Sequence, residues 1–189
     1  VGCAVMTGAG AALNTAKVEP GSTCVVFGAG GVGLNTIQGC AIAGANRIIA
    51  VDMSDKKLEF ARAFGATDTI NPNTDGDAVG KIMLMTGGGA DYAFECIGFG
   101  ATIAQAYNCV HKGGMAVVVG CVEEDDNGAL YNSALLLAGG EITHVHRKLY
   151  LPTYGIFQEG RFFSEGRKLR TAKLFGNPFG VLICEDFWH

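Results

Sequence analysis

The stretch STCVVFGAGGVGLNTIQGC, residues 22–40, decides the fold that we expect for this chain of 189 residues. Residues 22–28 form an apolar, β-branched run that ends in glycine, and such a run predicts a buried strand. Residues 31–44 carry apolar side chains at helical spacing, so a helix is predicted there. The turn between the two elements is rich in glycine, which allows a tight connection.

The same alternation of strand and helix continues through the first 120 residues. Apolar runs predict further strands at 47–52, 68–71, 91–98 and 115–120, and helices at 54–65, 77–86 and 101–110. In the helix at 54–65, Ser54 is placed as N-cap and Gly65 as the C-terminal stop. Repeated β-α units with apolar strands indicate a parallel sheet that is covered on both faces. We therefore predict an α/β fold with a Rossmann-type parallel sheet and helices on both faces.

The glycine-rich turn carries the first functional prediction. Gly28, Gly30 and Gly33 match the spacing G-x-G-x-x-G, which has little weight alone because 29 of the 189 residues are glycine. The context adds weight: a strand precedes the turn, a helix follows it, and Asp52 ends the next strand 19 residues after Gly33. A carboxylate there can accept hydrogen bonds from both ribose hydroxyls of a dinucleotide, whose pyrophosphate faces the helix N-terminus. The same carboxylate would repel a 2′-phosphate, so we predict NAD rather than NADP, bound by this turn with its Gly31 and Val32.

The pattern changes after residue 120. Residues 123–128, EEDDNG, predict a solvated acidic turn, and residues 129–138 and 141–148 predict a hairpin connected by two glycines. Two further strands are predicted at 169–175 and 179–184, with the turn GNP between them. We therefore divide the chain into a Rossmann domain at 1–120 and a β-rich C-terminal segment at 121–189. The hairpin is expected to pack beside the strand at 115–120.

Residues ~1–120 resemble the cofactor domain of the zinc-dependent medium-chain alcohol dehydrogenases. The likeness lies in GCAVMTGAGAALNTAKVEPGSTCVVFGAGGVGLNTIQGCAIAGANRIIAVD, FGATDTINP, TGGGADYAFECIG and HKGGMAVVVG. The resemblance implies bound NAD, with Lys57 beside the adenosine ribose and Thr7 near the nicotinamide. It also matches Cys3 to one of the three protein ligands of the catalytic zinc.

The sequence departs from that family at the zinc site. The other two zinc ligands come from a catalytic domain that these 189 residues do not contain. A catalytic zinc site takes three protein ligands and a water. We therefore expect that zinc is not retained, that Cys3 is an idle thiol, and that NAD is held without being turned over.

Residues ~117–189 resemble the carbon–nitrogen hydrolase (nitrilase) superfamily. The likeness lies in VVVGCVEEDDNGALYNSALLL, THVHRKLYLPTYGIFQEGRFF and FGVLICEDFWH. It implies that Cys184 is the nucleophile, that Lys148 stabilises the tetrahedral intermediate, and that Glu159 is a supporting glutamate. This chemistry is consistent, because a thiolate beside a cation has a lowered pKa. In that family the general-base glutamate lies in a region that the dehydrogenase-like sequence occupies here. Glu95 or Glu185 would therefore have to act as the general base instead.

Taken without the family, these C-terminal residues have simpler interpretations. Cys184 is expected to be a buried strand cysteine and Lys148 a solvated charge at a strand end. His144 and His146 alternate along one strand and share a face. A metal pair is one interpretation of them, and we favour the other, an exposed polar face.

Composition limits the partners. Residues 1–120 and 121–189 each carry seven basic and nine acidic side chains, so no basic patch indicates nucleic-acid binding. No apolar run reaches the ~18 residues of a membrane span. The seven cysteines contain no C-x-x-C pair, which is typical of reduced thiols in the cytoplasm. We expect a small-molecule ligand, and a homo-oligomer through exposed apolar strand edges near residues 135–138 and 181–184.

Three functions remain open from the sequence. The first is an NAD-binding module without competent catalysis, and the second is an amidase or nitrilase with a cysteine nucleophile. The third is a non-functional hybrid chain that binds nothing. A hybrid is considered because the strand at 115–120 is similar to strands of both families and could join a fragment of each.

Overall fold

The chain is described by a computed structural model, which covers residues 2–138, 141–153, 159–169, 171–174, 177–180, 183 and 186. Its elements, in chain order, are α1 (Gly2–Gly10), the π-helix η1 (Ala11–Ala16), β1 (Thr23–Phe27), α2 (Gly31–Ile42), β2 (Arg47–Val51), α3 (Asp55–Ala63), β3 (Asp68–Ile70), α4 (Pro72–Asp75), α5 (Ala78–Thr86), β4 (Ala90–Glu95), α6 (Gly100–Asn108), β5 (Val110–Glu124), β6 (Leu130–Ala138), β7 (Glu141–Arg147), the 3₁₀ helix η2 (Glu159–Arg161), β8 (Thr171–Leu174) and β9 (Asn177–Gly180).

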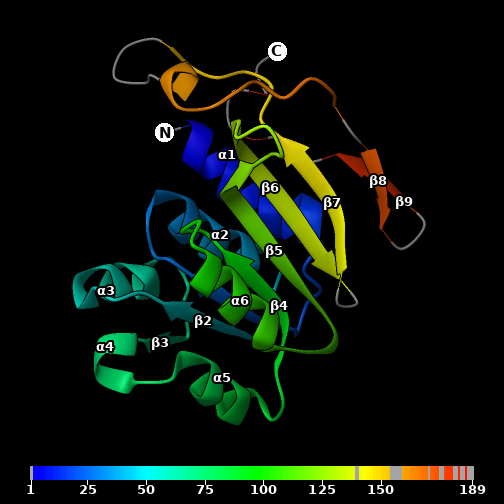
Figure 1. The fold of residues 1–189 in the computed structure, drawn as a ribbon. Helices are drawn as coiled ribbons and strands as arrows, with labels where there is room; N and C mark the ends of the chain where they lie inside the picture. Colours follow the sequence, from blue (N-terminus) through cyan, green and yellow to red (C-terminus); the bar gives the residue numbers. More distant parts are fainter. Residues whose placement is uncertain are drawn as a thin grey trace.

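The main sheet has seven strands in the order β3-β2-β1-β4-β5-β6-β7 (Figure 1). Strands β1 to β5 pair in parallel, whereas β6 and β7 add to the edge as antiparallel strands. The parallel part is the predicted Rossmann-type sheet. The strand order reverses direction between β1 and β4, and this switch point is where α/β sheets bind ligands outside the carboxyl ends of their strands.

The parallel strands are apolar on both faces because helices cover both. On one face the buried residues come from η1, α2 and α3 together with alternate strand residues such as Cys24, Val26 and Ile48. On the other face α5 and α6 pack against Val25 and Ile49. Four cysteines among the described residues are free thiols and are buried or partly buried: Cys24, Cys40, Cys96 and Cys109.

The helix ends follow local sequence. Ser54 is the N-cap residue of helix α3, as predicted, although its side chain makes no cap hydrogen bond. Instead, the backbone N–H of Ser54 donates to Asp52 Oδ1 at 2.9 Å. The helix stops before Gly65, whose φ of +114° lies in the region that favours glycine. The predicted stop is therefore confirmed.

The C-terminal strands differ in extent from the sequence prediction. Strand β5 runs for 15 residues, well beyond the predicted 115–120, and turns through residues 125–129 into β6. The predicted hairpin is present as β6 and β7, and it packs beside β5 as expected. Strand β9 begins at Asn177, inside the predicted turn, and pairs only with β8 in a separate sheet.

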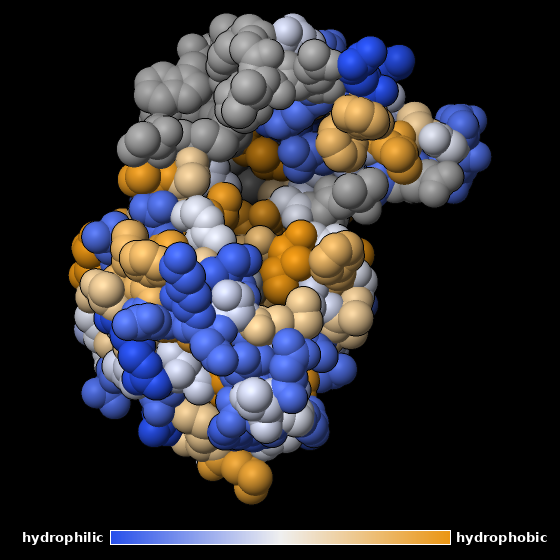
Figure 2. Space-filling view, turned by 90° about the vertical axis from the view of Figure 1, so that its left-hand side faces the viewer, coloured by the Kyte–Doolittle hydropathy of each residue, from blue (hydrophilic) through white to orange (hydrophobic). Residues whose placement is uncertain are grey.

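The surface of the sheet body is mainly hydrophilic on the side shown in Figure 2, with hydrophobic side chains gathered where the body meets the C-terminal segment. Among the described residues, no helix combines the length and apolar character that crossing a bilayer requires.

Candidate dinucleotide-binding site

The turn from β1 to α2 uses its three predicted glycines in different ways. Gly28 has a φ of +92°, and a Cβ there would lie 2.6 Å from Ile97 Cγ1. A Cβ on Gly33 would lie 1.7 Å from the carbonyl oxygen of Gly28. Around Gly30, by contrast, no heavy atom lies within 4 Å of such a Cβ. The outer glycines therefore permit close packing, and the middle one leaves open space where backbone and a pyrophosphate can approach each other.

Asp52 lies beside this turn, directly after β2. Its Oδ2 accepts a hydrogen bond from Ala29 N at 2.9 Å, and its Oδ1 accepts the bond from Ser54 N. Lys57 Nζ lies 3.6 Å from Oδ2. A carboxylate has about four acceptor positions, so two backbone bonds orient it and leave capacity for ribose hydroxyls. The residues present fit the dinucleotide that the turn predicts.

Helix α1 lies against the start of α2. A Cβ on Gly8 would come 2.3 Å from the carbonyl oxygen of Val32, and the Ala4 side chain lies 3.6 Å from the Cβ position of Gly31. Thr7, the residue expected near the nicotinamide, is therefore on a helix that contacts the turn. No helix was predicted from the sequence for the residues of α1.

The loop after β4 forms the other side of the switch point, and Glu95 shapes it. This fully buried carboxylate accepts hydrogen bonds from Ile97 N at 2.9 Å, Gly98 N at 3.0 Å and Thr102 Oγ1 at 2.8 Å. Because Ile97 contacts the Gly28 position, Glu95 acts on the turn through its loop. The sequence analysis offered Glu95 as a substitute general base. The structure shows it bonded to its own loop and to α6.

The loss of the family's zinc stays a prediction. Cys3 lies in α1, but its side chain lies outside the described part of the structure. Among the residues whose side chains are described, no group of three or more Cys, His, Asp and Glu is placed to hold a metal ion. We derive no chemistry through zinc here.

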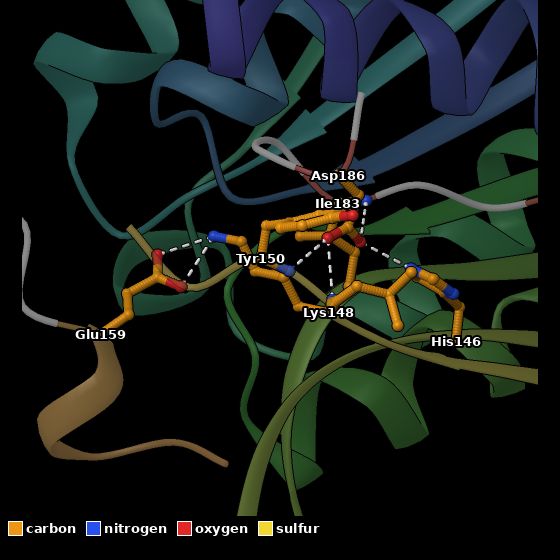
Figure 3. A network of polar contacts seen from close by, with 7 residues as sticks. His146, Lys148, Tyr150, Glu159, Ile183 and Asp186 are labelled. Carbon is orange, nitrogen blue, oxygen red and sulfur yellow. Dashed lines mark hydrogen bonds and ion pairs between the residues drawn. The ribbon is translucent and has the colours of Figure 1, made fainter. Parts of the chain in front are cut away.

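A second polar cluster lies at the end of β7 (Figure 3). Lys148 is 1% exposed, and its Nζ donates to both oxygens of Glu159 at 2.8 and 2.7 Å. The expectation of a solvated Lys148 was therefore wrong, since the chain folds η2 back onto the strand end and places a carboxylate there. The two residues that the nitrilase resemblance linked lie together. Cys184, the third, lies outside the described residues, as does Glu185.

Asp186 organises the same cluster. Its Oδ1 accepts from the backbone N–H groups of Leu149 and Tyr150 at 2.8 and 2.9 Å, and its Oδ2 lies 2.7 Å from His146 Nε2 and accepts from Ile183 N at 3.2 Å. Burial acts to raise the pKa of Asp186, but these hydrogen bonds outweigh it and hold the pKa below its usual range. Asp186 was not predicted from the sequence, because a single acidic residue outside a periodic segment carries no pattern.

The prediction of an exposed His144–His146 face was wrong. The two residues are only 7% and 1% exposed. The C-terminal segment, through Asp186, contacts this face of the edge strand, and no periodicity in β7 itself could have indicated that cover.

Comparison with known proteins agrees with the geometry of the turn. The family described as zinc-binding dehydrogenase matches residues 31–153, which is more than half of the chain and continues past residue 120. Alcohol dehydrogenase class-3 from Myxine glutinosa is 52% identical over 122 residues, which are 64% of this chain and 32% of that protein.

Two solved structures are similar in the same part. Benzyl alcohol dehydrogenase from Acinetobacter calcoaceticus is 41% identical, with a TM-score of 0.62 over 64% of this chain and 33% of that chain. The alcohol dehydrogenase zinc-binding domain protein from Burkholderia ambifaria is 42% identical, with a TM-score of 0.59 over 61% of this chain and 31% of that chain. The chain thus spans about a third of the length of these relatives. On the family match, this chain belongs to the zinc-binding dehydrogenases.

Proposed function

We propose that this chain is an NAD-binding module of the alcohol dehydrogenase type. The observation that carries the proposal is the open space at Gly30 beside the oriented carboxylate of Asp52. The start of α2 would face the pyrophosphate, Asp52 would accept from the ribose hydroxyls, and Lys57 would lie next to that ribose. The domain at 1–120 supplies all of these groups.

The module binds its cofactor without oxidising alcohols by itself. When bound, NAD supplies a hydride acceptor. In the described residues, however, nothing is placed as a three-ligand zinc site to polarise an alcohol oxygen. The role that we assign to these residues is therefore binding and orientation, with Thr7 on the nicotinamide side.

A titration with NADH tests the proposal. We expect saturable enhancement of nicotinamide fluorescence and a rise in melting temperature, because a ligand that binds only the folded state stabilises it. Asp52→Ala should weaken binding at least tenfold, and NADPH should bind the wild-type chain more weakly than NADH. Asp77→Ala, which changes a carboxylate at the N-terminus of α5, is the matched control. Equal affinity in Asp52→Ala and Asp77→Ala would reject the assigned site.

The ion pair of Lys148 and Glu159 favours a second candidate, a hydrolase of amides or nitriles. In this function Cys184 attacks the carbonyl or nitrile carbon, and Lys148 offsets the negative charge that develops. Mass spectrometry of iodoacetamide-treated protein would measure the alkylation rate of Cys184. Fast alkylation at neutral pH that slows in Lys148→Met would support this function. Alkylation of Cys184 no faster than that of Cys109, whose pKa burial raises to about 12, would argue against it.

The prediction of an exposed edge at 135–138 was wrong, because β6 pairs with β5 on one side and with β7 on the other. Of the second predicted edge, at 181–184, only residue 183 is described. We propose instead self-association through β7, the last strand of the main sheet in the described residues. Ile142 on this edge strand is 58% exposed, and an apolar edge offers unpaired backbone groups to a second chain. Light scattering after size exclusion should show an oligomer that Ile142→Lys shifts to the monomer. A wild-type monomer at all concentrations would refute this interface.

A further inference from the structure

His144 and His146 occupy adjacent positions on one face of β7, the edge strand of the main sheet. Residues two apart on a strand have Cα atoms about 6.8 Å apart and point to the same face. Both are buried here, although histidine side chains are polar at two nitrogen atoms. One nitrogen atom of each ring, His144 Nε2 and His146 Nδ1, is buried without a hydrogen-bond partner among the described residues, although each residue has a partner elsewhere.

The His146 ring has one nitrogen paired and one unpaired. Its Nε2 lies 2.7 Å from Asp186 Oδ2, and both side chains have zero exposed area. Its Nδ1 is buried without a hydrogen-bond partner in the described part of the chain. Because the carboxylate is ionised and only accepts, it selects the tautomer with the proton on Nε2. In the part of the chain that the structure describes, the Nδ1 atom has no hydrogen-bond partner.

The described neighbours of His146 along β6 and β7 offer no donor to Nδ1. On β6 the residue opposite His146 is Ala134, which offers only a methyl group. The next residue on the same face of the chain, Lys148, donates to both oxygens of Glu159 instead. A histidine that ligates a metal usually has its other ring nitrogen bonded to a carboxylate, as His146 is to Asp186.

We propose that His144 and His146 form a two-imidazole site for a borderline divalent cation such as Zn²⁺, Ni²⁺ or Cu²⁺, with Asp186 as a positioning residue. Imidazole suits these ions. The described residues supply no third protein ligand, so water completes the coordination. This site uses none of the residues of the dinucleotide turn, and its test is independent of NAD binding.

A competition titration tests the proposal. Metal-free full-length protein competes with a chromophoric chelator for Zn²⁺, and the same titration is run on variants. His146→Gln and His144→Gln should each weaken binding at least tenfold, and Asp186→Asn by about 10- to 100-fold, as for other carboxylates behind a histidine ligand. His111→Gln is the control, because His111 is an exposed histidine that pairs with Asp91.

Two further measurements separate ligation from folding and from thiol binding. The melting temperature of each metal-free variant identifies those that fail to fold. His146→Cys should recover zinc binding that His146→Gln lacks, since a thiolate can replace imidazole as a zinc ligand. The other cysteines are common to all variants, so the difference between variants reports the histidine site. Zinc affinity that is the same in the wild type, His146→Gln and His111→Gln would overturn the proposal and leave Nδ1 facing a water molecule.

Discussion

The Cβ position of Gly33 lies 1.7 Å from the carbonyl oxygen of Gly28, so any side chain at residue 33 must displace the end of β1 or the start of α2. This contact ties the first helical turn after the motif to the strand before it. Gly30 lies between the two and has no neighbour within 4 Å of its Cβ position. In this motif Gly33 is required for packing, whereas Gly30 leaves space for a ligand. Substitutions at the two positions should therefore have different effects on stability and on binding.

Gly33→Ala should destabilise the fold. The added methyl group overlaps backbone atoms that cannot rotate away, and overpacking of this kind costs about 1–3 kcal/mol or more. Urea denaturation would measure the loss.

Gly30→Ala should keep the free energy of unfolding within about 1 kcal/mol of wild type, because Gly30 already has an extended backbone and serves as the N-cap of α2. Its NADH binding should nevertheless be lost, since the methyl group fills the space for the pyrophosphate. A stable Gly33→Ala, or a Gly30→Ala that binds NADH normally, would contradict this division.

Glu95→Ala should destabilise the first domain more than an ordinary surface change. Two backbone N–H groups, of Ile97 and Gly98, would lose their acceptor, whereas the Thr102 hydroxyl can still donate to the Phe99 carbonyl. Leaving buried donors unsatisfied costs about 1–3 kcal/mol for each group. Glu59→Ala, on the exposed side of α3, is a matched control that should change the melting temperature little. Equal melting temperatures for the two variants would show that the loop finds other acceptors.

The sequence was sufficient for the parallel sheet because local signals and tertiary contacts agree there. Val25 and Ile49 are apolar, β-branched and buried between two helix layers, so their identity reports their environment directly. The glycine turn and Asp52 were predictable for the same reason, since their spacing along the chain fixes their proximity in a βα unit.

The C-terminal cluster was not predictable in this way. His146, Lys148 and Asp186 are brought together by contacts across as many as 40 residues of sequence. Lysine and aspartate are usually exposed and histidine is intermediate, so residue type alone favoured solvent exposure. The resemblance to the nitrilase superfamily linked Lys148 with Glu159 and so indicated that they lie close together. It did not indicate that Lys148 is buried or that Asp186 takes part.

The His111–Asp91 pair should make stability depend on pH. The hydrogen bond that His111 donates to the Asp91 carboxylate, together with a bond to the Lys112 carbonyl, raises the pKa of His111. A raised pKa means stabilisation that is complete below about 6.5, the unfolded value, and is lost as pH rises through the folded value. For Asp91, burial acts to raise the pKa, but hydrogen bonds from Thr23 N and His111 hold it below its usual range. Its contribution is present above about pH 4 and is lost as pH falls through the lowered value.

The contribution of the pair should therefore be largest between about pH 4 and 6.5. His111→Gln should lower the free energy of unfolding by about 0.2–1 kcal/mol near pH 5, as expected for a partly exposed ion pair, and by less at pH 8. Asp91→Asn should remove the same difference. A destabilisation by His111→Gln that is equal at both pH values would show that packing, and not the charge of His111, is responsible.

The buried ion pair of Lys148 and Glu159 should respond unequally to loss of either partner. Lys148 is 1% exposed at its side chain, whereas Glu159 is 24% exposed. After Glu159→Gln the ammonium group would remain buried without a carboxylate, and losing one partner of a buried pair costs as much as about 3–5 kcal/mol. After Lys148→Met the carboxylate of Glu159 can still reach water. Denaturant unfolding should therefore rank Glu159→Gln as the less stable variant.

The double variant Lys148→Met with Glu159→Gln completes the comparison. It should be more stable than Glu159→Gln alone, because it removes the stranded charge and replaces it by an apolar side chain of similar length. The coupling free energy from the four proteins measures the interaction between the two side chains. Additive losses in the double variant would mean that the two side chains act independently of each other. In that case the cluster at the end of β7 would depend for its stability on Asp186 and its backbone hydrogen bonds.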